Sequence, residues 1–128
     1  MPLIFKLFWI GLGGFLGAIS RYGLSGLVYK LFSDPWMPCG TMICNVLGCF
    51  LIGLFGGLIE AKQIFSPHTR LFMFIGLLGG FTTFSTFGME TFNLMREGQW
   101  LPSLLNIILT VVLGLTAVWL GFTLTRIK

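Results

Sequence analysis

The sequence predicts an all-α membrane protein with four transmembrane helices in each subunit. Of its 128 residues, 55% are hydrophobic and only 9% are charged, whereas an ordinary soluble domain has about 25% charged residues. The mean hydropathy is +0.94, and the 8 Lys and Arg with 4 Asp and Glu cannot cover a soluble domain. A membrane-spanning helix needs roughly 20 apolar residues, so four helices leave room only for short loops. These observations exclude a soluble enzyme and a disordered chain.

Runs without charged residues place the four spans within one domain. Three runs carry no charge at all: Pro35–Ile59, Leu71–Met89 and Gly98–Thr125. A further apolar stretch near the N-terminus is interrupted by one arginine. The predicted spans are, in order, 4–31, 36–60, 70–96 and 100–126.

The first span continues past Arg21. The apolar stretch begins at Leu7 and resumes after the arginine as far as Tyr29. Lys6 before the stretch and Ala18-Ile19-Ser20 within it would also suit a signal peptide, but a signal peptide would not need the second apolar stretch. Arg21 has two interpretations. Either it extends toward the membrane surface, or it raises the electrostatic potential for an anion in a water-filled vestibule.

The second span carries a polar pair inside the predicted membrane region. Thr41 and Asn45 are four residues apart and therefore lie on one helix face. Polar side chains inside a membrane are costly, which makes them candidates for function. The alternative is that Asn45 only joins two helices by hydrogen bonds. Cys39, Cys44 and Cys49 do not share a face, so we interpret them as small apolar side chains and not as a metal site.

The third span is predicted to break at its centre. It contains the run Gly79-Gly80-Phe81-Thr82-Thr83-Phe84-Ser85-Thr86-Phe87. Two glycines followed by two β-branched threonines form a poor α-helix, and irregular backbone at this depth is tolerated only inside protein or beside a cavity. Broken helices of this kind often present carbonyl groups to cations. Phe84 and Phe87 are three residues apart, and they form either a binding face or ordinary packing.

The fourth span places Ser103, Asn106 and Thr110 on one stripe. Together, the second, third and fourth spans offer hydroxyls, carboxamides and phenyl edges, and the one carboxylate that this track can include is Glu90. Rings of carboxylates suit cation channels, so a track of neutral donors favours a small anion. The chain has no set of nucleophile, base and acid, and no enzymatic activity is predicted.

Glycine spacing bears on how the helices pack. The spacing GxxxG occurs at Gly13/Gly17, Gly53/Gly57 and Gly76/Gly80. In lipid, small residues let helices approach closely. These glycines serve either to pack this small bundle or to join a second copy of the chain. Four helices alone enclose little, so we expect an oligomer.

The basic residues lie mostly between the apolar runs, and the formal net charge is +4. We therefore interpret them as membrane anchors and not as contacts to nucleic acid. The side that holds both termini carries five of them: Lys6, Lys62, Arg70, Arg126 and Lys128. The other side carries Lys30 and Arg96. This bias modestly favours a cytoplasmic N-terminus.

These residues resemble the Fluc (CrcB) family of small fluoride channels. The resemblance rests on the first-span segment Gly13-Gly14-Phe15-Leu16-Gly17-Ala18-Ile19-Ser20-Arg21-Tyr22, on Gly40-Thr41 with Asn45 and Gly48, and on the run 79–87 followed by Glu90. The run in the third span is highly specific, whereas the glycine-rich first-span pattern alone would be weak. The resemblance extends over nearly the whole chain, including its length and number of spans.

The resemblance implies an antiparallel, dual-topology homodimer in the bacterial inner membrane. Two pores per dimer would pass fluoride passively and so lower its concentration in the cytoplasm. By resemblance, Asn45 is the pore asparagine, and Phe84 and Phe87 are the stacked phenylalanines. The hydroxyls that match the family's polar track belong to Thr41, Ser85 and Thr110.

The resemblance also implies a central sodium ion that is structural and not transported. Backbone carbonyls at Gly79 and Thr82 match the positions that hold it. Two carbonyls from each subunit would give four neutral oxygens across a two-fold axis, which suit a hard monovalent ion, whereas a divalent ion would want carboxylates. Asn106 departs from the family, which can carry an aromatic residue such as tyrosine there.

The chemistry of fluoride agrees with these residues. Fluoride is small and strongly hydrated, so a pore must replace its water with close donors, such as the two N–H groups of Asn45 and the threonine hydroxyls. The positive edge of a phenyl ring can also hold an anion. Two other functions remain open. A small proton-coupled drug exporter would need an embedded carboxylate, typically in its first helix, and none occurs there. A structural membrane subunit would transport nothing.

Overall fold

The computed structural model describes residues 1–32 and 36–127. Within these residues all regular elements are helical: α1 (Leu3–Leu31), α2 (Cys39–Lys62), α3 (Pro67–Arg70), the π-helix η1 (Leu71–Leu78), α4 (Gly79–Phe81), α5 (Phe84–Arg96) and α6 (Trp100–Leu124). Four segments are long and apolar enough to cross a membrane, namely α1, α2, the stretch Pro67–Arg96 and α6. The predicted class, an all-helical multi-pass membrane protein, is confirmed. Pro35 at the start of the uncharged run Pro35–Ile59 and Lys128 in the charge comparison lie outside the described residues.

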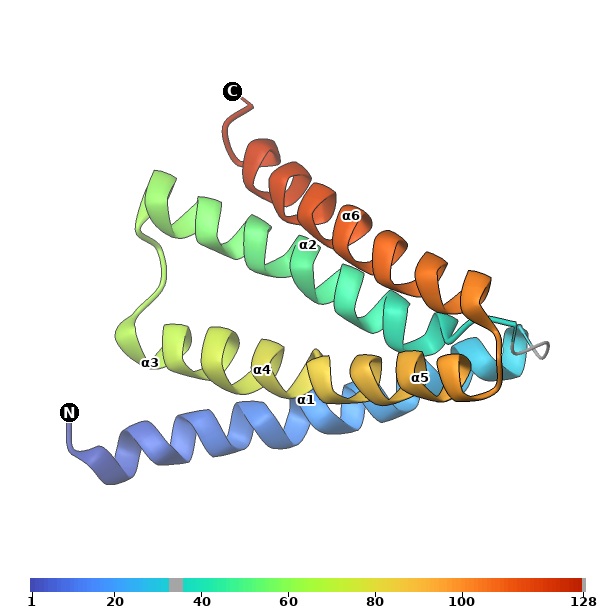
Figure 1. The fold of residues 1–128 in the computed structure, drawn as a ribbon. Coiled ribbons are helices and arrows are strands. Elements are labelled where there is room, and N and C mark those ends of the chain that lie inside the picture. Colours follow the sequence, from blue (N-terminus) through green and yellow to red (C-terminus); the bar gives the residue numbers. More distant parts are fainter. Residues whose placement is uncertain (33–35, 128) are drawn as a thin grey trace.

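The four spans form two pairs (Figure 1). α2 lies along α6, and α1 lies along the third segment, which consists of α3, η1, α4 and α5. Both chain ends and the connection from α2 to α3 lie at the same end of the molecule, and the two pairs diverge toward that end. At the opposite end, α2 contacts both α1 and α5.

The ends of the spans differ by a few residues from the predicted ones. α2 begins at Cys39 rather than at 36, and the third segment begins at Pro67 rather than at 70. The early start has a local cause: the Ser66 hydroxyl accepts the N–H of Thr69 at 3.2 Å, and Pro67 occupies the first turn. A serine cap followed by proline is a strong signal for the start of a helix.

The third segment changes its helical form along its length. It winds as a π-helix from Leu71 to Leu78 and as an α-helix from Gly79 to Phe81. Thr82 and Thr83 then have extended backbone angles (φ −92°, ψ 153° and φ −150°, ψ 117°) before α5 begins. The π-helix was not predicted, because hydropathy patterns do not distinguish the wider turn from an α-helical one. Such turns are rare and often occur near functional sites.

Glycines let the paired helices touch backbone to backbone. A Cβ added to Gly13 would lie 2.8 Å from the backbone nitrogen of Leu77, and one added to Gly17 would lie 2.9 Å from that of Phe81. Between α2 and α6, a Cβ on Gly121 would lie 2.8 Å from the nitrogen of Leu54. The two uses foreseen for the GxxxG glycines were packing within the chain and joining a second copy. Packing within the chain is the one that these contacts show.

Replacing Gly17 by alanine should therefore separate α1 from the third segment. We expect Gly17→Ala to lower the free energy of unfolding by about 1–3 kcal/mol, because the added methyl group meets backbone that cannot move alone. Thermal unfolding of the purified protein in detergent measures this.

The matched control is Gly23→Ala on the same helix, where a Cβ would meet nothing within 4 Å. Alanine is the better helix former by about 0.5–1 kcal/mol, so Gly23→Ala should be neutral or stabilising. Equal stabilities for the two variants would contradict the packing role of Gly17.

Candidate functional site

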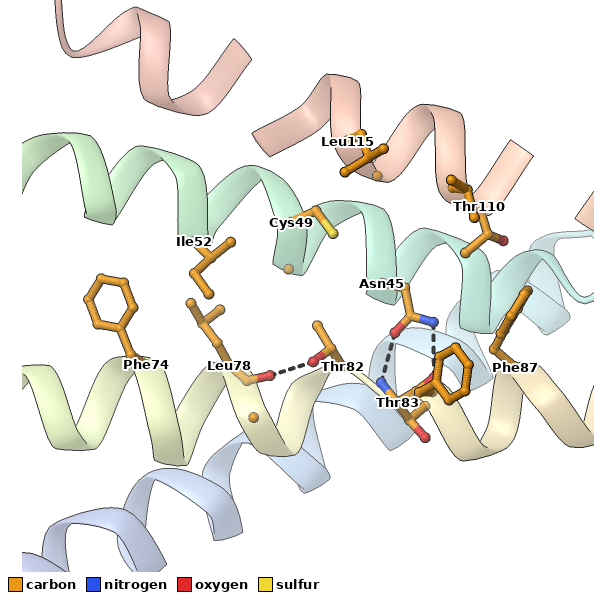
Figure 2. Close-up of a pocket in the computed structure, with 15 residues that line it drawn as sticks. Asn45, Cys49, Ile52, Phe74, Leu78, Thr82, Thr83, Phe87, Thr110 and Leu115 are labelled. Atoms are coloured by element: carbon orange, nitrogen blue, oxygen red, sulfur yellow. Dashed lines mark hydrogen bonds between the residues drawn. The ribbon is translucent and has the colours of Figure 1, made fainter. Parts of the chain in front are cut away.

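An uncharged groove lies between α2, the third segment and α6. Its volume is about 470 Å³, and none of the described residues that line it is charged. Asn45 enters it from α2, Thr82 and Thr83 from the stretch before α5, and Thr110 from α6 (Figure 2). The remaining lining is apolar and includes Phe87. A cavity of this kind suits a ligand that needs a few close hydrogen-bond donors in a dry surrounding.

Asn45 holds the backbone of the third segment with both ends of its carboxamide. The Thr83 N–H donates to Asn45 Oδ1 at 2.8 Å, and Asn45 Nδ2 donates to the Thr83 carbonyl at 3.1 Å (Figure 2). Asn45 therefore joins two helical segments by hydrogen bonds, as one of the two predictions for it stated. A carboxamide nitrogen carries two N–H groups, so one N–H remains for a ligand in the groove.

This pair of hydrogen bonds redirects the backbone of the third segment. In a continuous α-helix the Thr83 N–H would donate to the Gly79 carbonyl, but it donates to Asn45 instead. Likewise, the Thr86 N–H would donate to the Thr82 carbonyl, but it donates to the Thr83 hydroxyl at 3.2 Å. The carbonyls of Gly79 and Thr82 have thus lost their helical donors.

Arg21 approaches the same stretch from the opposite side. Its Nε donates to the Gly80 carbonyl at 3.2 Å, and the residue is half-buried. Arg21 does not line the groove. This contact ties α1 to α4, as a structural role for Arg21 would, and the attraction of an anion by Arg21 stays a prediction.

Phe84 and Phe87 stand together at the groove. Their ring centroids are 5.6 Å apart and their planes meet at 50°, and both residues line the groove. Phe84 is 84% exposed in the single chain. Ordinary packing within one subunit therefore does not account for its position.

Two of the predicted track residues lie outside the groove. The Thr41 hydroxyl donates to Glu90 Oε1 at 2.7 Å, and the Tyr29 hydroxyl donates to the same oxygen at 3.4 Å. Glu90 Oε2 is buried and has no hydrogen-bond partner among the described residues. Ser85 is exposed, and its hydroxyl lies 3.2 Å from that of Thr83.

The structure thus brings together six of the predicted site residues: Asn45, Gly79, Thr82, Phe84, Phe87 and Thr110. It leaves Thr41, Ser85 and Arg21 outside the groove. Of the stripe on α6, only Thr110 lines the groove, while Ser103 and Asn106 are buried. The backbone of Thr83, which binds Asn45, was not among the predicted site groups. Threonine is a preferred N-cap residue, so the sequence signal identifies its hydroxyl as a cap and not its backbone as the partner of Asn45.

Comparison with known proteins identifies the family. The sequence profile described as CrcB-like protein, Camphor Resistance (CrcB), matches residues 8–122. The chain belongs to the CrcB family. The matched range contains all of the predicted site residues, from Arg21 to Thr110.

Similar proteins in the CrcB family cover nearly the same length. The fluoride-specific ion channel FluC of Methylobacillus flagellatus is 41% identical over 123 residues, which are 96% of this chain and 96% of the relative. Its namesake in Nitrosococcus oceani is 44% identical over 124 residues (95% and 97%). The FluC of Chloroflexus aurantiacus is 47% identical over 117 residues (91% and 92%).

Removing the Asn45 carboxamide should destabilise the stretch around Thr83. We expect Asn45→Leu to lower the free energy of unfolding by about 1–3 kcal/mol, since it removes two hydrogen bonds and leaves the part-buried N–H of Thr83 without a partner. Thermal unfolding in detergent measures the change.

The control is Asn93→Leu, because Asn93 lies on α5 away from the groove. If Asn45→Leu were as stable as this control, the two hydrogen bonds to Thr83 would not hold the segment.

Proposed function

We propose that this protein is a fluoride-selective channel, and not an enzyme, which lets fluoride leave the cytoplasm passively. The observation that carries the proposal is the uncharged groove, which collects Asn45, Phe84, Phe87 and Thr110. The relatives are named fluoride-specific ion channels and are 41–47% identical over nearly the full length. Their names are the reason for proposing fluoride as the ion.

The groove offers donors without a fixed opposite charge. The second N–H of Asn45 and the hydroxyl of Thr110 replace water around a small anion, and the phenyl edges of Phe84 and Phe87 add a positive electrostatic surface. Chloride is larger and fits a narrow track of this kind badly. We propose that Ser85, next to Phe84 on α5, and Thr41, one turn before Asn45 on α2, continue the track beyond the groove.

The functional unit that we propose is an antiparallel homodimer in the bacterial inner membrane, with two pores. The exposure of Phe84 supports a second subunit, because a partner would cover this ring. Dual insertion is compatible with the modest charge bias of the chain, in which five basic residues lie on the side of the termini and two on the other.

We further propose that the third helix is broken at Thr82 and Thr83 and that a structural sodium ion lies at the break. The carbonyls of Gly79 and Thr82 fit such an ion, since both have lost their helical donors to Asn45 and Thr83. In lipid each unsatisfied carbonyl costs several kcal/mol. The described residues contain no cluster of His, Cys, Asp or Glu side chains for a metal, so backbone oxygens would be its ligands. When bound, its charge favours anions in the neighbouring pores.

Flux measurements in liposomes test the proposed function. Purified protein in liposomes loaded with fluoride should release it without a proton gradient, and chloride should leave far more slowly, as recorded with ion-selective electrodes. Equal release of chloride would contradict selectivity. A need for a proton gradient would indicate an exporter, and the absence of any flux would indicate a structural subunit.

Variants of the aromatic pair connect this flux to the groove. Phe84→Ile and Phe87→Ile should slow fluoride release, because an aliphatic side chain lacks a positive edge. Phe92→Ile is the control, since Phe92 lies on the same helix and does not line the groove. Three variants with the same flux, all dimeric, would assign Phe84 and Phe87 to packing.

Replacement of sodium tests the cation site. Purification with a large organic cation in place of sodium should weaken the dimer and reduce fluoride flux, because the carbonyls of Gly79 and Thr82 would be left without a partner. Dimer stability is measured by size-exclusion chromatography and flux in liposomes. The same dimer stability and flux without sodium would rule out the site.

A further inference from the structure

A chain of hydrogen bonds connects α5 to α6 behind the groove. The Thr91 hydroxyl donates to the Phe87 carbonyl at 2.7 Å, and Asn106 Nδ2 lies 2.9 Å from the Thr91 hydroxyl. At the other end, the Thr110 hydroxyl lies 3.5 Å from Asn106 Oδ1. Phe87 and Thr110 line the groove, whereas Asn106 is only 1% exposed and does not.

The direction of every bond in this chain follows from one backbone group. A carbonyl only accepts, so the Thr91 hydroxyl must give its single hydrogen to Phe87. Thr91 can then only accept from Asn106, which fixes the carboxamide with its nitrogen toward Thr91 and its oxygen toward Thr110. A carboxamide oxygen only accepts, so the Thr110 hydroxyl donates to Asn106.

We propose that Asn106 is a positioning residue that holds the hydroxyl hydrogen of Thr110 away from the groove. Thr110 then presents its oxygen lone pairs to the groove, and these repel an anion. An anion can use Thr110 as a donor only by taking the hydrogen from Asn106. The inference rests on the proposed function, because it concerns how this chain binds fluoride.

The lengths of the bonds indicate that this competition is reversible. The two bonds that orient Asn106 are short, at 2.7 and 2.9 Å, whereas the bond to Thr110 is long, at 3.5 Å. A long hydrogen bond is weak, so a strong acceptor such as fluoride can displace it. Asn106 thereby sets the fluoride concentration at which Thr110 begins to contribute.

The test compares Asn106→Leu in two backgrounds. Leucine is similar in size and accepts no hydrogen bond, so it frees the hydroxyl of Thr110. The fluoride concentration that gives half-maximal flux in liposomes should fall about two- to threefold, the low end of what one net hydrogen bond provides, because the bond to Asn106 is long. With Thr110→Val also present there is no hydroxyl to free, and Asn106→Leu should have no such effect.

A second variant frees the Thr110 hydroxyl while leaving Asn106 in place. Thr91→Val removes the hydroxyl that orients the carboxamide, so Asn106 can turn its nitrogen toward Thr110 and release the hydrogen. The half-maximal concentration should fall again, and again only with Thr110 present. If the Asn106→Leu variant does not form the dimer, Thr91→Val tests the inference instead, through the same comparison of variants with and without Thr110→Val. Thr123→Val is the control on α6, because its hydroxyl donates to the Trp119 carbonyl at 2.6 Å and lies outside the groove.

Equal effects of Asn106→Leu or Thr91→Val with and without the Thr110 hydroxyl would overturn the inference and leave Asn106 as a packing residue. So would an unchanged half-maximal concentration. If the unmodified protein passes no fluoride, the proposed function fails instead. Thermal unfolding of Asn106→Leu, Thr110→Val and the double variant then still reports on the hydrogen bond, through a non-additive shift in the unfolding temperature. Additive shifts would show that the bond is absent.

Discussion

The two hydrogen bonds between Asn45 and the backbone of Thr83 are the interaction on which the rest of the site depends. They take the Thr83 N–H out of the helical pattern and add a second acceptor contact at the Thr83 carbonyl, at a depth where water cannot replace a lost partner. The segment therefore stops winding at Phe81 and starts again at Phe84, with the hydroxyl of Thr83 as the new cap. The same two bonds place a polar carboxamide in a groove that is otherwise mostly apolar.

Close contact between the helices makes this arrangement possible. Helices in lipid have little hydrophobic drive to associate, so they need backbones that touch. The glycines on α1 provide such contact to η1 and α4, and Arg21 adds a hydrogen bond to the Gly80 carbonyl. The irregular stretch is thus held from α1 on one side and from α2 on the other. A side chain at Gly13 or Gly17 would separate the elements that fix the groove.

The groove combines neutral donors with aromatic edges, and its polar groups are already engaged with the protein. Asn45 has one N–H left, and Thr110 gives its hydrogen to Asn106. A ligand can therefore use the remaining N–H of Asn45 directly, but at Thr110 it must replace Asn106 as the acceptor. This requirement favours an anion that accepts strong hydrogen bonds, in agreement with the proposed selectivity for fluoride. It also explains how a site can bind an anion that is hard to dehydrate without retaining a permanent positive side chain in the groove.

The sequence by itself determined the helical class, the four candidate spans and the family, because hydropathy, length and a specific run such as 79–87 are properties of the chain and not of its folding. It also placed Asn45, Thr82, Phe84 and Phe87 among the candidates, since polar or irregular residues in a span stand out against an apolar background. Only the tertiary structure decided which of them meet. Thr41 and Asn45 share a face of α2, yet Thr41 contacts Glu90 and Asn45 contacts Thr83. The partner of Asn45 is a backbone group 38 residues away, and periodicity gives the face of a helix but not what lies opposite. The direction of the Thr110 hydroxyl was equally beyond the sequence, because it follows from a chain of bonds that begins at a carbonyl on another helix.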